Sequence, residues 1–165
     1  MTPIGRRAFL TAAGGAAAAL AGCLGDAGPD GMTVQGVDVR GSPGGPIAVM
    51  PADTVVLLDF WATWCAPCKP QMAELRTVRE RFPEVHLLSI TNESDVDAVR
   101  AFWEAYDGTW PVATDTELRT NERFGVNRIP TLLVFDRAGE RVWSHVGLAA
   151  ADDIADRLAA AGARG

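Results

Sequence analysis

The chain has 165 residues, of which 48% are hydrophobic and 22% charged, and its 21 acidic residues outnumber 15 basic ones. This length suits one domain with a terminal appendage, and the composition excludes a wholly disordered chain or a fibrous repeat. No cluster of Lys and Arg follows Arg7, which argues against nucleic-acid binding. The acidic excess is spread along the sequence and is typical of a solvated surface or of adaptation to high salt.

The first 22 residues have the pattern of an export signal. Residues 1–9 carry positive charge, and residues 10–22, LTAAGGAAAALAG, form an uncharged run. A bilayer core of about 30 Å needs roughly 20 apolar residues, so this run is too short to span it. Arg6-Arg7 resembles a twin-arginine signal, although Gly5 stands where that pattern usually has Ser or Thr. A short amphipathic helix of the domain is the alternative.

A lipidation motif follows the apolar run. Leu20-Ala21-Gly22-Cys23 resembles a lipobox, at which a signal is cut before a cysteine that receives lipid. We therefore expect a twin-arginine-type lipoprotein signal peptide at 1–22, a lipidated N-terminus with linker and leading strand at 23–44, and a folded domain at 45–165. Because the short linker at 24–31 extends to at most about 29 Å, the domain would stay near the outer face of the cytoplasmic membrane.

The rest of the chain shows strand and helix patterns in alternation. Residues 33–39 alternate weakly as a strand before the breaker GSPGGP at 41–46, and TVVLLDFW at 54–61 is typical of a central strand covered on both faces. The expected elements that follow are a helix over 67–82, a strand over 85–90, helices over 95–106 and 118–124, strands over 132–135 and 142–146 joined by a hairpin turn, and a helix over 152–161. This order predicts an α/β domain with a central mixed β-sheet flanked by helices.

The stretch WCAPC at 64–68 follows the predicted central strand and runs into the start of the first predicted helix. The unpaired N–H groups and the positive dipole end of a helix favour a thiolate on Cys65, with Cys68 one turn further on. A purely structural disulfide is a poor explanation, because closing so short a loop removes little chain entropy. The spacing therefore predicts that Cys65 attacks a substrate disulfide and that Cys68 then resolves the mixed disulfide.

Asp59 interrupts the otherwise apolar strand at 54–61. Burying a carboxylate costs several kcal/mol unless it is paired, so we expect a pKa raised towards neutrality and a role as acceptor of the Cys68 proton. An aspartate that merely caps an element or lies at the sheet edge is the alternative. Further along, Ile129-Pro130 precedes a strand, where a cis peptide would turn a free backbone edge towards the cysteines.

VVLLDFWATWCAPCK at 55–69, with RIPTLLVF at 128–135, resembles thioredoxin, and FWATWCAPC behind a lipid-anchor signal resembles the exported TlpA/ResA-like thiol-disulfide oxidoreductases. The resemblance covers about residues 45–161 and implies a thioredoxin-like fold. It implies an exposed nucleophile at Cys65, a resolving thiol at Cys68, a buried proton acceptor at Asp59, a cis-proline at Pro130 and flanking aromatics at Trp61 and Trp64. The expected substrate-binding residues are Trp64, Ala66, Pro67, Ile129 and Pro130.

The sequence departs from these relatives at three positions near the motif. Ala66 replaces the commoner Gly between the cysteines, Ala73 stands where many relatives have a helix-kinking proline, and Gln71 stands where many exported ones have Glu. The dipeptide between the cysteines tunes the redox potential, so Ala66 bears on the preferred direction of the exchange.

We therefore expect an exported, lipid-anchored, monomeric thiol-disulfide oxidoreductase that works in the reductive direction on protein thiols and disulfides. Apocytochrome c is one expected kind of substrate, a membrane component the expected electron donor, and the Cys65–Cys68 disulfide acts without a bound cofactor or metal. A copper chaperone and a thiol peroxidase of the same fold are the alternatives. The former resembles a pattern with three residues between its cysteines, and the latter normally has a threonine at the position of Ala62.

Overall fold

The computed structural model describes residues 31–165. The predicted signal peptide at 1–22, with Arg6-Arg7, and the predicted lipidation site Cys23 lie outside the described residues. Within residues 31–165, every helix is too short or too polar to cross a bilayer.

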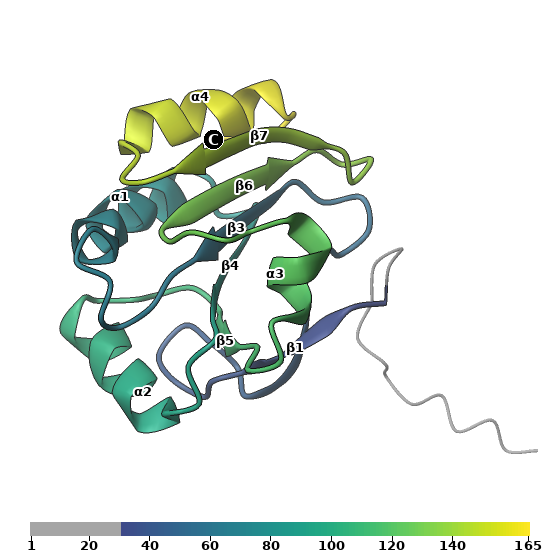
Figure 1. The fold of residues 1–165 in the computed structure, drawn as a ribbon. Helices are drawn as coiled ribbons and strands as arrows, with labels where there is room; N and C mark the ends of the chain where they lie inside the picture. Colours follow the sequence, from purple (N-terminus) through teal and green to yellow (C-terminus); the bar gives the residue numbers. More distant parts are fainter. Residues whose placement is uncertain (1–30) are drawn as a thin grey trace, which may run out of the picture.

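The described chain folds into one seven-stranded mixed sheet with four helices packed on its two faces (Figure 1). The strands are β1 (Thr33–Gly36), β2 (Gly45–Ala48), β3 (Val56–Phe60), β4 (His86–Thr91), β5 (Val112–Thr114), β6 (Thr131–Phe135) and β7 (Arg141–Val146). The helices are α1 (Cys68–Arg81), α2 (Val96–Ala105), α3 (Arg119–Phe124) and α4 (Ala151–Ala160). The strands lie in the order β2-β1-β5-β4-β3-β6-β7, and the thioredoxin-like fold expected from the sequence is confirmed.

β3 is an interior strand of the sheet. It pairs in parallel with β4 and antiparallel with β6, and all five of its residues are buried. Its near-continuous apolar sequence fits this position, because a strand covered on both faces needs no solvent-facing polar positions. The alternative that Asp59 lies at a sheet edge is therefore wrong.

The two faces of β3 contact different hydrophobic clusters. Leu57 and the following Trp61 pack with residues of α1, α2 and α4, whereas Leu58 and Phe60 pack on the face that α3 covers. Side chains alternate between the faces of a strand, so Asp59 points to the same face as Leu57, towards the layer that contains α1.

Helix α1 buries one side along its length. Cys68, Gln71, Met72, Leu75 and Val78 are its buried residues, at the three- and four-residue spacing of an amphipathic helix. Arg79 and Arg81 in the last turn complement the negative end of the helix dipole. The helix begins at Cys68 and not at Pro67, because Pro67 occupies the N-cap position.

Two short strands, β2 and β5, were not predicted. β2 begins inside the breaker GSPGGP, where Gly45 pairs with Gly36 of β1 and Ile47 is buried. β5 has three residues and lies between β4 and β1. Neither stretch is long enough to show an alternating pattern, so pairing with a formed neighbouring strand decides both.

Gly108 allows the closest approach to the aromatic core. A Cβ at this position would overlap the indole ring of the fully buried Trp103. We expect Gly108→Ala to lower the free energy of unfolding by about 1–3 kcal/mol, because the added methyl group forces packed side chains or the backbone to shift. Urea unfolding measures the change. Gly44→Ala is the control, because its nearest neighbour, the Asp38 side chain, lies 3.2 Å from the added Cβ on the surface. Equal effects of the two substitutions would contradict the prediction.

Candidate active site

Cys65 and Cys68 form a disulfide at the start of helix α1, with the Sγ atoms 2.03 Å apart and the Cα atoms 5.3 Å apart. Two successive turns build this geometry, since Cys65 N–H donates to Ala62 O and Cys68 N–H donates to Cys65 O. Cys68 is thus the first helical residue and not one turn inside the helix. Both sulfurs lie at the end of the helix where free N–H groups gather.

Cys65 is only 4% exposed in this disulfide form, because its side chain packs in the apolar cluster beside Cys68. The expectation of an exposed nucleophile is therefore not met in the oxidised protein. Its neighbours form the accessible rim, where Trp64 is 74% exposed and Ala66 and Pro67 are exposed. A reacting partner meets these three side chains first.

The Ile129-Pro130 peptide is cis, as the resemblance implied. Ile129 is half-buried and packs against both hydrophobic clusters, while Pro130 is buried. The carbonyl of Pro130 accepts a hydrogen bond from Gly147 N–H at 2.9 Å, which ties the residue before β6 to the end of β7.

A groove of about 530 Å³ opens beside the cysteine turn. Trp64 and Ile129 both line it, whereas the other predicted substrate-binding residues, Ala66, Pro67 and Pro130, do not. Its further lining residues are Leu118, Val126, Gly125, Asn92, Asn121, Asn127, Glu122 and Arg128. The groove therefore combines apolar walls with three amide side chains, and it joins the cysteine turn to α3.

Leu118 is a groove residue that the sequence did not reveal. It is 45% exposed and adopts a left-handed backbone conformation with φ of 61°, which is unusual for a branched side chain. It precedes α3 as the N-cap residue, and its only sequence signal was the predicted start of a helix at 118.

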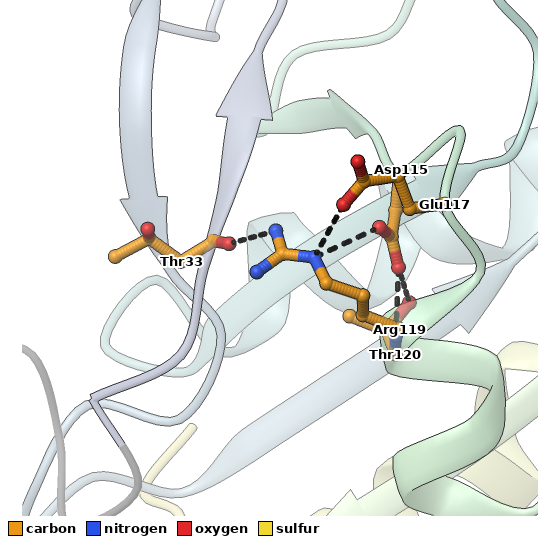
Figure 2. A network of polar contacts seen from close by, with 5 residues as sticks. All are labelled: Thr33, Asp115, Glu117, Arg119 and Thr120. Carbon is orange, nitrogen blue, oxygen red and sulfur yellow. Dashed lines mark hydrogen bonds and ion pairs between the residues drawn. The ribbon is translucent and has the colours of Figure 1, made fainter.

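A polar network holds the turn that carries Leu118 (Figure 2). The buried Asp115 carboxylate accepts hydrogen bonds from Thr120 N–H and Thr120 Oγ1, each at 2.7 Å. Arg119 donates to Thr33 O at 3.0 Å and forms ion pairs with Asp115 and Glu117. The network thus joins β1 to the first turn of α3 and supports one wall of the groove.

The loop between β3 and the cysteines is anchored on its two sides. Thr63 donates to the Glu93 carboxylate through its N–H at 2.8 Å and its hydroxyl at 2.6 Å, and Thr91 Oγ1 also donates to Glu93. Trp61 packs on Phe102 with ring centroids 4.6 Å apart. Glu93, which the sequence analysis did not single out, therefore fixes the approach to Cys65 by charge-assisted hydrogen bonds.

Gln71 connects the cysteine helix to α4. Its buried amide donates to Ala149 O at 3.1 Å and accepts from Ala149 N–H at 2.8 Å, so both of its polar ends are paired. Glu74, one turn further along α1, accepts from Ala151 N–H at 2.7 Å. An amide suits this position, because Glu in its place would lack the donor that Ala149 O requires.

Asp59 is 2% exposed, and burial raises its pKa to about 7 from 3.8. A hydrogen bond from the Ser89 hydroxyl to Asp59 Oδ2, at 2.7 Å, acts in the opposite direction and lowers the pKa. Asp59 Oδ1 has no hydrogen-bond partner among the described residues. The carboxyl group is thus able to gain or lose a proton near neutral pH, as expected.

Few other groups in the described chain offer chemistry. Burial lowers the pKa of His86, and His145 stacks on Trp143. Residues 31–165 contain no group of three or more His, Cys, Asp or Glu side chains placed to hold a metal ion.

Residues 41–158 match the protein-family model described as Redoxin. The chain is 31% identical over 107 residues to the thioredoxin-like protein YneN of Bacillus subtilis, covering 62% of this chain and 62% of YneN. It is 30% identical over 94 residues to the thiol-disulfide oxidoreductase ResA of Bacillus cereus, covering 56% of this chain and 54% of ResA. The chain thus spans a little over half the length of these curated relatives.

Solved structures share the fold at lower identity. A secreted Mycobacterium tuberculosis disulfide oxidoreductase homologous to Escherichia coli DsbE superposes with a TM-score of 0.67 and 22% identity, covering 78% of this chain and 95% of the other. The segment matched by the family model contains both cysteines, Asp59 and Pro130. The chain therefore belongs to the Redoxin family, as a ResA-like protein with the thioredoxin fold.

Proposed function

We propose that the protein is an extracytoplasmic thiol-disulfide oxidoreductase that exchanges its Cys65–Cys68 pair with protein thiols and disulfides. The observation that carries this proposal is the disulfide at the start of α1. It lies on the sheet face to which Asp59 points, and Asp59 is a buried carboxyl group with a pKa of about 7. The similarity to ResA, a thiol-disulfide oxidoreductase, supports it.

The proposed reaction begins from the reduced pair. The Cys65 thiolate attacks one sulfur of a substrate disulfide, so that a mixed disulfide forms and the other substrate sulfur leaves as a thiolate. Asp59 accepts the Cys68 proton, and the Cys68 thiolate attacks Cys65 Sγ. The second substrate sulfur then leaves, and two electrons have passed from the pair to the substrate. The product is the Cys65–Cys68 disulfide.

The groove beside the cysteine turn supports a polypeptide substrate. Trp64 and Leu118 provide exposed apolar surface for a side chain, and the exposed amides of Asn92 and Asn127 are able to bond a peptide backbone. Because the groove runs from Trp64, next to Cys65, towards α3, residues flanking a substrate cysteine would bind there. We expect the protein to reduce the disulfide of its substrate, and to do so without a bound cofactor.

The proposed location follows from the N-terminal sequence. The signal at 1–22 and Cys23 indicate export and attachment to the outer face of the cytoplasmic membrane. The structural relative from Mycobacterium tuberculosis is a secreted protein, which supports export. We propose that the monomeric domain receives electrons from a membrane donor and that apocytochrome c is among its substrates.

The two cysteines should have different roles in the reduction of insulin by dithiothreitol. We expect the protein to accelerate insulin precipitation over dithiothreitol alone, and Cys65→Ser to abolish the acceleration because the nucleophile is lost. Cys68→Ser should instead accumulate a mixed disulfide between Cys65 and insulin, visible by non-reducing electrophoresis. Lys69→Ala, an exposed neighbour, controls for the local change. A wild-type rate equal to that of dithiothreitol alone would overturn the proposal.

The buried Asp59 should make the oxidised protein less stable as the pH rises. Its pKa is about 7 in the folded protein and near 3.8 when unfolded, so the folded state holds the proton more tightly between these values. Stability therefore falls from about pH 4 to pH 7 and is level above. We expect Asp59→Asn to be more stable than wild type by up to about 4 kcal/mol at pH 8 and equally stable near pH 4.

Urea unfolding of the oxidised proteins across this pH range measures the difference. Asp156→Asn, which removes an exposed carboxylate from α4, is the control for a simple change of surface charge. A wild-type minus Asp59→Asn difference that does not vary with pH would mean that Asp59 does not hold its proton in this way.

Cys23→Ser should release the protein from the membrane. In a host that processes lipoproteins, we expect the wild type in the membrane fraction and the variant in the soluble extracytoplasmic fraction, because the acylated sulfur is lost. Insulin reduction by the released variant should be unchanged. Recovery of both proteins in the same fraction would contradict lipid anchoring at Cys23.

A further inference from the structure

We propose that Ser89 and Trp110 are positioning residues for the proton acceptor, forming a donor chain that occupies Asp59 Oδ2 and leaves Oδ1 as the oxygen that takes the Cys68 proton. This inference rests on the proposed function and adds to it the atom that receives the proton and the two side chains that select it.

The three side chains form a continuous buried chain of hydrogen bonds. Trp110 Nε1–H donates to Ser89 Oγ at 2.9 Å, and Ser89 Oγ–H donates to Asp59 Oδ2 at 2.7 Å. Ser89 and Trp110 have no exposed surface, and Asp59 has almost none. In the described structure, both hydrogen bonds of this series therefore join buried protein side chains.

The direction of the chain follows from the chemistry of its first member. An indole N–H only donates, so Ser89 Oγ must accept the bond from Trp110. The Ser89 hydroxyl has one hydrogen, and the Asp59 carboxylate has none to offer. The hydroxyl hydrogen is therefore directed at Asp59, which favours the charged form of the carboxyl group.

Sheet pairing brings the three residues together. Asp59 and Ser89 are register partners on the parallel strands β3 and β4. Ser89 also pairs with Val112 of β5, and its N–H donates to Pro111 O at 3.1 Å, which places the residues before β5 beside it. Trp110 is held in turn by Trp103, whose ring centroid lies 5.0 Å from its own.

The surroundings of Asp59 leave few other groups to set its charge. The apolar side chains on its face of β4, β6 and α1 belong to one cluster that includes Leu87, Leu132, Val134, Met72 and Leu75. Within this cluster the titratable groups are Cys65, Cys68 and the half-buried Tyr106, and in the oxidised protein both thiols are held in the disulfide. Burial and Ser89 are the causes of the displaced Asp59 pKa.

The chain gives the two carboxyl oxygens different roles. Oδ2 is stabilised as an anion by Ser89, whereas Oδ1 has no hydrogen-bond partner among the described residues. A proton arriving on Oδ1 leaves the Ser89 bond intact. Without Ser89, burial alone would keep the acid protonated at neutral pH, and a protonated carboxyl group cannot act as a base.

The test is the titration of the Asp59 side-chain carboxyl carbon by ¹³C NMR in oxidised full-length protein, where no cysteine in the disulfide titrates. Ser89→Ala should raise the Asp59 midpoint by about one to two pH units, because a hydrogen bond to a charged group is lost. Trp110→Phe should raise it by less, because the hydroxyl remains but its orientation is no longer imposed. Ser89→Thr keeps the hydroxyl and should keep the wild-type midpoint.

The double variant Ser89→Ala with Trp110→Phe shows whether Trp110 acts on Asp59 through Ser89 or independently of it. If Trp110 acts through Ser89, Trp110→Phe should add no further shift in the Ser89→Ala background. Leu87→Val removes one methylene from the same face of β4 and is the control for loosened packing, with an unchanged midpoint expected. An unchanged midpoint in Ser89→Ala, or additive shifts in the double variant, would overturn the inference. Insulin reduction is measured separately, so a failure of the proposed function does not alter the titration result.

Discussion

The site depends on one constraint, which is a carboxyl group placed in the middle of a seven-stranded sheet. Asp59 lies on β3, which pairs with a strand on each side. All residues of β3 are buried, so neither face of the strand is exposed to water. Burial raises the pKa of this carboxyl group, and a single hydrogen bond from Ser89 lowers it. This balance places the pKa of the carboxyl group near 7, where proton transfer to and from a thiol is efficient.

Around this group, the protein holds the cysteine turn rigidly and leaves the adjacent groove accessible. Glu93 and the aromatic residues of α2 fix the loop before Cys65, and Gln71 fixes the helix that begins at Cys68. Trp64 and Leu118, by contrast, present apolar surface to solvent, where a partner can cover it.

The polar residues around the start of α3 have a structural role that serves the groove. Asp115 is buried because it accepts the N-terminal hydrogen bonds of a very short helix, which would otherwise lack a cap. Arg119 extends this arrangement to the backbone of β1. The strained conformation of Leu118 is maintained by contacts on both of its sides in the sequence, which is the usual condition under which such strain persists.

The sequence by itself determined the chemistry and the main elements. Two cysteines with two residues between them, an acid in an apolar strand and a proline before another strand are local patterns, and their meaning depends on spacing and residue type. The central strand and the long helix were equally visible, because they bury continuous or periodic apolar residues. Ser89 interrupts its predicted strand as Asp59 does, so the pair of polar interruptions in neighbouring strands was a signal that could have been read.

Only the tertiary structure decided which distant residues meet. The partners of Asp59, Thr63 and Gln71 lie 30, 30 and 78 positions away along the chain, and β2 and β5 exist through pairing with their neighbours. Strand register and helix packing set these contacts, and both arise from the whole core and not from any local pattern. The groove is of the same kind, since Trp64, Leu118 and Ile129 come from three segments that the folded sheet alone brings together.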